Sequence, residues 1–125
     1  MWPQVAPLLA KALVRERGRF SLRDIRNWVL SGDQELWVIT RQGRAVAAGL
    51  VRIHHYPSGK RSAVLHFLGG GRVREWALDA WKAWLEACHL AGITEMRIVG
   101  RRGWIRIVER FGFKPEAVIL TREEV

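Results

Sequence analysis

The sequence is poor in several features that define whole classes of protein. Its single cysteine, Cys88, excludes an internal disulfide and a cysteine-based zinc site. The longest apolar run, residues 45–51, is much too short to cross a bilayer, and no charged-then-apolar signal segment opens the chain. The histidines show no metal-ligand spacing, and neither a P-loop nor a Gly-x-Gly-x-x-Gly pattern occurs. We therefore expect a cytoplasmic protein with no metal and no membrane contact.

The composition is that of a basic globular protein. Of its residues, 49% are apolar, and seven are tryptophan, which is far from the composition of a disordered chain. A length of 125 residues predicts one domain, covering residues 1–125. The net charge of +9 favours an anionic partner, either a phosphate-bearing cofactor or a nucleic acid. A solvated basic surface without a partner is the simpler alternative.

The first half of the chain reads as two helices followed by a β-meander. Helical spacing of leucines predicts a helix over residues 7–17, with Pro7 in its first turn. A second helix begins at Ser21, where Asp24 stands at the third position of a capping box, and it ends at Gly32. Residues 35–40, 45–56 and 61–68 read as strands joined by tight turns, so they form antiparallel hairpins.

The pattern changes after the third strand. Apolar residues recur at helical spacing over residues 73–91, then come a strand at 93–99, a short helix at 103–111 and a final strand at 113–121. A strand, a crossover helix and another strand favour parallel pairing. The predicted fold is α/β (α+β in stricter usage). It has a mixed, mostly antiparallel sheet of five to six strands and four flanking helices.

Gly69-Gly70-Gly71, between the third strand and the long helix, is the most informative local feature. Glycines let the backbone turn sharply and leave amides exposed at a helix N-terminus, where the helix dipole favours phosphate. Arg72 and Arg74 add positive charge at the same turn. A plain strand-to-helix turn is the alternative interpretation.

Two other groups of residues bear on function. Arginines gather near the last helix, and three of them are spaced four apart, so they could contact an anion or a nucleic acid or form a solvated face: Arg101, Arg102, Arg106 and Arg110. The tryptophans could stack on bases, but their spacing favours core packing.

The order of elements, together with Phe111-Gly112-Phe113 after the last helix, resembles the acyl-coenzyme-A-binding part of the GNAT N-acetyltransferases. The resemblance covers roughly residues 33–122. The segment Gly100-Arg101-Arg102-Gly103-Trp104 is also similar to one in small GNAT-like proteins of tailed bacteriophages, which implies a bacterial host cytoplasm and a phage or host protein as a further partner.

The resemblance implies an acyltransferase that moves an acetyl or acyl group from acyl-coenzyme A to an amine on an unknown acceptor. Acetyl-coenzyme A would be the co-substrate, and it would bind at the glycine turn, at Leu68, Gly69, Gly70, Gly71, Arg72 and Arg74. His66, in the strand before that turn, is the candidate general base, because imidazole titrates near neutral pH. A hydrogen-bonded core histidine is the alternative.

Two departures from the family pattern leave a second hypothesis open. The phosphate loop is shorter than the family's, and Val108 stands where the family often has a tyrosine that protonates the departing thiolate. The alternative is therefore a catalytically inactive GNAT-like domain that binds nucleic acid or a virion protein.

Overall fold

The computed structural model describes residues 1–124, so Val125, the last residue of the expected domain, lies outside it. One mixed sheet contains β1 (Glu35–Arg41), β2 (Arg44–His55), β3 (Arg61–Gly70) and β4 (Glu95–Ile98), in that order. The first three strands are antiparallel neighbours, and β4 pairs parallel to β3. The predicted meander and the parallel pair that follows it are both confirmed.

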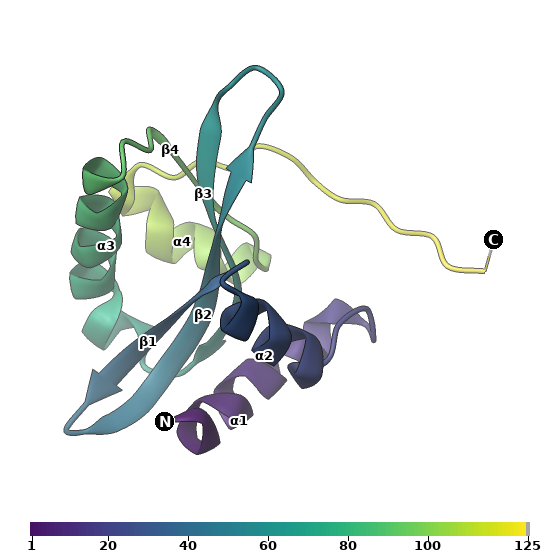
Figure 1. The fold of residues 1–125 in the computed structure, drawn as a ribbon, viewed down its shortest axis with the longest axis vertical. Coiled ribbons are helices and arrows are strands. Elements are labelled where there is room, and N and C mark those ends of the chain that lie inside the picture. Colours follow the sequence, from purple (N-terminus) through teal and green to yellow (C-terminus); the bar gives the residue numbers. More distant parts are fainter. Residues whose placement is uncertain (125) are drawn as a thin grey trace.

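Helices cover both faces of this sheet. Helices α1 (Trp2–Leu13) and α2 (Leu22–Ser31) lie on one side, and the long α3 (Val73–Leu90) lies on the other (Figure 1). The short α4 (Ile105–Val108) follows β4 on the α3 side. Because β4 runs parallel to β3, the chain has to cross one face of the sheet between the two strands, and α3 makes this crossover.

Several short 3₁₀ helices extend these elements. η1 (Val14–Glu16) continues α1, while η2 (Arg102–Trp104) and η3 (Glu109–Phe111) flank α4. The first helix therefore begins five residues earlier than predicted, and Pro7 lies inside it. Pro3 occupies the first turn instead, where a missing N–H costs nothing. The predicted capping box is confirmed, because Ser21 and Asp24 bond each other's backbone N–H at the start of α2.

The predicted final strand is wrong. Residues 113–121 have no strand partner, and Val118, Ile119 and Leu120 are 74%, 84% and 90% exposed. Phe113 still packs on Trp81 and Trp84, whereas the end of the chain stands away from the body of the molecule (Figure 1). The sheet of residues 1–124 therefore has four strands and not five or six. Alternating apolar residues favour a strand, but a strand forms only where a neighbouring strand supplies hydrogen bonds.

The core is divided by the sheet into two clusters. The cluster under α1 and α2 includes Leu9, Ile25 and Leu50, all fully buried. The cluster under α3 includes Trp84 and Cys88, and burial raises the pKa of the Cys88 thiol. Core positions predicted for the tryptophans are confirmed for Trp84 and also for Trp76.

Candidate functional site

Strands β3 and β4 are paired over only four residues, because β4 ends at Ile98 while β3 continues to Gly70. Their register ends at the pair Leu65 and Ile98, and the last bond between them is donated by the N–H of Val99 to the Leu65 carbonyl, at 2.9 Å. Immediately beyond, Phe67 has a left-handed φ of 58°, and the register between β2 and β3 shifts. This is a β-bulge, which bends and twists the strand that contains it. Beyond Leu65, β3 continues without β4 beside it, and we call this unpaired edge of β3 the opening between β3 and β4.

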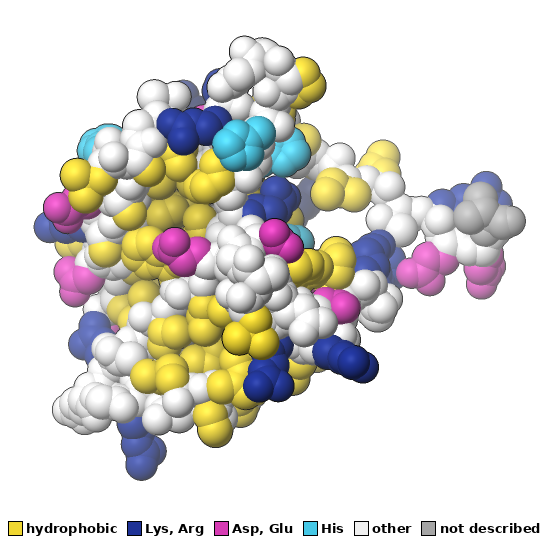
Figure 2. All heavy atoms as spheres, in the orientation of Figure 1, with side chains coloured by type: hydrophobic (Ala, Val, Ile, Leu, Met, Phe, Trp, Pro, Cys, Tyr) yellow, Lys and Arg dark blue, Asp and Glu magenta, His cyan; other side chains and the backbone are white. Residues whose placement is uncertain are grey.

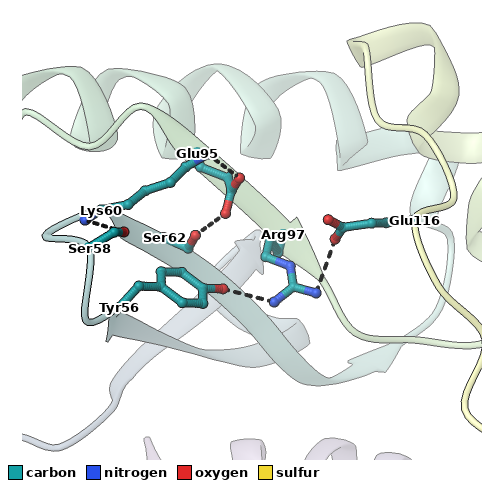
Figure 3. Close-up of polar contacts among 7 residues, drawn as sticks. All are labelled: Tyr56, Ser58, Lys60, Ser62, Glu95, Arg97 and Glu116. Carbon is teal, nitrogen blue, oxygen red and sulfur yellow. Dashed lines mark hydrogen bonds and ion pairs between the residues drawn. The ribbon is translucent and has the colours of Figure 1, made fainter.

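The opposite end of this strand pair is held together by side chains (Figure 3). The Lys60 ammonium lies 2.8 Å from the Glu95 carboxylate, which also accepts a hydrogen bond from the buried Ser62 hydroxyl. The hydrogen bonds from Lys60 and from Ser62 lower the pKa of Glu95. The same carboxylate raises the pKa of Lys60. The start of β4 is thereby fastened to the β2–β3 hairpin.

A second set of contacts fixes the outer edge of β4. The Arg97 guanidinium donates to the Tyr56 hydroxyl at 3.0 Å and pairs with Glu116 at 3.1 Å (Figure 3). The hydrogen bond that Arg97 donates to Tyr56 is the main cause that raises the pKa of Arg97. Glu95 is the first residue of β4 and Arg97 is the third, so these contacts hold the part of β4 that is paired with β3, and the pairing ends after Leu65 and Ile98.

His66 lies at the edge of this opening, on the α1–α2 side of the sheet. Its Nε2 is 2.7 Å from a carboxylate oxygen of Glu16 in η1, and its ring stacks on Phe67 at 3.9 Å. The side chains of His66 and Glu16 are only 18% and 17% exposed. A carboxylate accepts but does not donate, so Nε2 is the donor in this pair, and when the ring is neutral Nδ1 keeps its lone pair. Glu16 was not identified from the sequence.

The three glycines have different surroundings, and only one of them lies in the turn. Gly69 and Gly70 are the last residues of β3, while Gly71 follows the strand. A Cβ added to Gly69 would lie 2.0 Å from the Leu8 carbonyl oxygen of α1. Gly70 has a φ of 143°, and its backbone lies against β2. The Trp76 indole N–H donates to the Gly71 carbonyl at 2.9 Å. Close backbone packing therefore requires glycine at the first two positions.

A basic cavity of about 150 Å³ lies where β3 ends. Three cations from distant parts of the chain, Lys11, Arg15 and Arg101, line it together with Gly69 and Gly70. Leu68 also lines it. The exposed Arg72 and Arg74 stand at the start of α3, and Arg72 has a left-handed φ of 54°. Lys11 and Arg15 were not identified from the sequence, although their spacing of four predicts that they share one helix face.

The other predicted arginines lie along three consecutive short helices. Arg102, Arg106 and Arg110 fall in η2, α4 and η3 in turn, and all three are exposed. Arg110 lies over the Phe111 ring, 5.0 Å from its centroid. Of the four arginines proposed as anion contacts, Arg101 alone lines the basic cavity.

A second cavity, of about 80 Å³, lies between the sheet, α3 and α4, and its lining is almost entirely apolar. It is bordered by Leu65 and Ile98, the last paired residues of β3 and β4, so it begins directly beneath the opening. Trp37 and Trp84 also line it, and within residues 1–124 their buried indole N–H groups have no hydrogen-bond partner. Apolar side chains gather on this part of the surface (Figure 2).

Residues 1–124 contain no cluster of three or more side chains suited to a metal ion. Within the same range, every helix is too short or too polar to cross a membrane.

Comparison by sequence finds neither a matching family model nor a matching curated protein. Comparison by structure finds acetyltransferases. A predicted acetyltransferase from Clostridium acetobutylicum, solved with acetyl-CoA, matches with a TM-score of 0.69 and 12% identity over 98% of this chain and 92% of that one. A ribosomal-protein-alanine N-acetyltransferase from Brucella melitensis matches with a TM-score of 0.69 and 13% identity over 95% and 90%.

A third solved structure has a family name in its description. A GCN5-related N-acetyltransferase from Ralstonia eutropha matches with a TM-score of 0.68 and 16% identity over 94% of this chain and 91% of that one. At such low identity the comparison is informative about the fold alone. The chain therefore has the GNAT fold of these acetyltransferases.

Proposed function

We propose that this protein is an acyltransferase that moves an acyl group from acyl-coenzyme A to an amine. The observation that supports the proposal most is the opening between β3 and β4, with a basic cavity at one end and the His66–Glu16 pair beside it. A fold by itself does not define an activity. Here cations, an opening between strands and a candidate base lie together.

The donor would bind along the end of β3. The basic cavity holds Lys11, Arg15 and Arg101, three cations that suit the phosphates of coenzyme A. The backbone amides at the start of α3, an 18-residue helix, add to this attraction, as predicted for the glycine turn. Beyond Leu65 no strand pairs with the β4 side of β3. An extended arm with amide groups, such as pantetheine, can pair with that edge as a strand would.

His66 would act as the general base. As the amine nitrogen attacks the thioester carbonyl, Nδ1 takes the amine proton, and Glu16 holds the ring and stabilises the imidazolium that forms. Negative charge moves to the carbonyl oxygen and returns when the carbon–sulfur bond breaks. The thiolate leaves and is protonated by solvent, because Val108 stands where the family often places an acid.

Isothermal titration calorimetry with acetyl-coenzyme A and with free coenzyme A tests the donor site. We expect both to bind the wild-type protein. Loss of one charge-assisted hydrogen bond costs roughly 1.5 kcal/mol, so Arg15→Gln and Arg101→Gln should each weaken binding about tenfold. Arg26→Gln is the matched control, because Arg26 is exposed on α2 and does not line the cavity. Absence of heat with either ligand would refute the proposal.

The base is tested by thiol release from acetyl-coenzyme A with a panel of primary amines such as polyamines and lysine peptides. His66→Gln should lower the rate of transfer by about 10²–10⁴-fold and leave the affinity for coenzyme A unchanged. Glu16→Gln should lower the rate less and shift its pH dependence, because Glu16 acts through the ring. If His66→Gln transfers at the wild-type rate, His66 is a core histidine and not the base.

The nucleic-acid hypothesis makes a different prediction. Binding to DNA through exposed arginines such as Arg106 would fall steeply as salt increases. The described residues show no feature that favours it over the acyltransferase, and Arg106 does not line the basic cavity.

A further inference from the structure

We infer that the apolar cavity beneath the strand opening is the acyl site of the donor, and that it takes a four-carbon chain in preference to acetyl. This inference rests on the proposed acyltransferase function and names the class of thioester. The cavity lies on the α3 side of the sheet, and it includes Leu65 and Ile98, where β3 and β4 part. An acyl group whose thioester lies in the opening would enter the cavity directly.

The two cavities are neighbours. Leu68, Trp104 and Ile107 line both the basic cavity and the apolar one. The end of β3 is therefore flanked by a basic cavity and an adjacent apolar one, which matches a molecule with phosphates at one end and an apolar chain at the other. Acyl-coenzyme A is such a molecule, whereas a nucleotide has no apolar chain for the second cavity.

The indole groups in the wall indicate that the cavity is not simply loosely packed core. Trp84 is only 7% exposed, yet its N–H has no acceptor in the part of the chain that the structure describes, and the same holds for Trp37. Buried donors nearly always have a partner, which can be a ligand or ordered water. Two unpaired donors in one wall fit an occupant that brings an acceptor, and in an acyl thioester that acceptor is the carbonyl oxygen at the head of the chain.

The volume sets the length of the chain. A water-sized group occupies about 30 Å³ in a liquid, so a cavity of about 80 Å³ holds roughly three non-hydrogen atoms. Acetyl has one carbon beyond the carbonyl and leaves most of this space empty. Butyryl has three and fills it, while hexanoyl has five and exceeds it. Each methylene group transferred from water strengthens binding about fourfold.

The test is calorimetric titration of the whole chain with free, acetyl-, butyryl- and hexanoyl-coenzyme A. We expect butyryl-coenzyme A to bind about fifteenfold more tightly than acetyl-coenzyme A, with no further gain for hexanoyl. Equal affinities for all the thioesters, with coenzyme A bound, would overturn this inference and leave the proposed function standing. Failure of every ligand to bind would overturn both. Steadily tighter binding through hexanoyl would also overturn the inference.

Substitutions in α3 and α4 test whether the preference for butyryl arises in this cavity. Ala80 is half-buried and lines the cavity, whereas Ala83 is exposed on the same helix and does not. Ala80→Leu should abolish the preference for butyryl and keep the affinity for free coenzyme A, and Ala83→Leu should keep both. Val108→Ile adds a single carbon to the cavity wall and should reduce the preference if Ala80→Leu fails to fold. An unchanged preference in a folded cavity variant would refute the assignment.

Discussion

The substitution Gly69→Ala tests whether the glycines before α3 are present for close packing or for the binding of phosphate. The added Cβ would lie 2.0 Å from the carbonyl oxygen of Leu8 and 2.9 Å from its carbon. Since an ordinary contact for such an atom begins at 3.4 Å, helix α1 must move away by about 1.4 Å. The atoms that must move are backbone, so no side-chain rotation relieves the clash.

The cost follows from what α1 contributes to the core. Val5 and Leu9 of this helix are fully buried against the sheet. A radial gap of 0.5–1 Å already forfeits about a quarter to a half of a van der Waals contact. Overpacking costs about 1–3 kcal/mol, and a shift of this size places Gly69→Ala at the upper end, near 3 kcal/mol. For a chain of this length the melting temperature should fall by about 12 °C.

Urea unfolding followed by tryptophan fluorescence measures this loss, with Gly71→Ala as the matched control. A Cβ on Gly71 would meet no atom within 4 Å, and Gly71 does not have a left-handed φ. Its substitution should therefore change stability by no more than about 0.5 kcal/mol. If Gly69→Ala and Gly71→Ala proved equally stable, the close approach of α1 to β3 would not exist in solution.

Two further substitutions test local interactions. Ser21→Ala removes the cap of α2, in which the Asp24 N–H donates to Ser21 at 3.2 Å, and should lower the free energy of unfolding by about 1 kcal/mol in the same urea assay. Glu95→Gln removes a carboxylate whose pKa is lowered by Lys60 and Ser62. The ionised carboxylate is the stabilising form, so at pH 7 the wild type should have a larger free energy of unfolding than the variant. This difference should shrink as the pH falls below 4.5 and Glu95 becomes protonated. A difference independent of pH would show that Glu95 contributes no ion pair.

The elements that were predicted well are those whose signal is local. The capping box of Ser21 and Asp24 depends on three consecutive peptide units, and the helix over α3 depends on one apolar face. The meander followed from turn residues between short apolar runs. The final strand failed because its formation depends on a neighbour that no local pattern specifies. Glycine at 69 was read as a turn residue for the same reason, since the approach of Leu8 is a contact across 61 positions.

Sequence reasoning singled out His66 and the glycine turn but not the side chains that lie around them. His66 was singled out because it interrupts an apolar strand, but Glu16 lies 50 residues away in sequence, and nothing local indicates that η1 folds back onto β3. The same holds for Lys11 and Arg15, which reach the end of β3 only because α1 packs on the sheet. Side chains brought together by tertiary packing leave little trace in the sequence around each of them.

The sheet separates the two halves of the proposed reaction. His66 and Glu16 lie on its α1–α2 side, while the apolar cavity lies on its α3 side and is lined by Leu65, the residue before His66. The amine and the base would then act from one face while the acyl chain stays buried at the other. Substitutions at residues without shared partners have additive free energies.

The double variant His66→Gln with Ala80→Leu should therefore show the product of the two single effects. His66→Gln should lower the rate for every thioester by the same factor, and Ala80→Leu should change only the preference for butyryl. Rates of transfer from acetyl- and butyryl-coenzyme A, measured on all four proteins, check this. If His66→Gln altered the preference between thioesters, the base and the acyl chain would share one space, and the division of the reaction between the two faces of the sheet would be wrong.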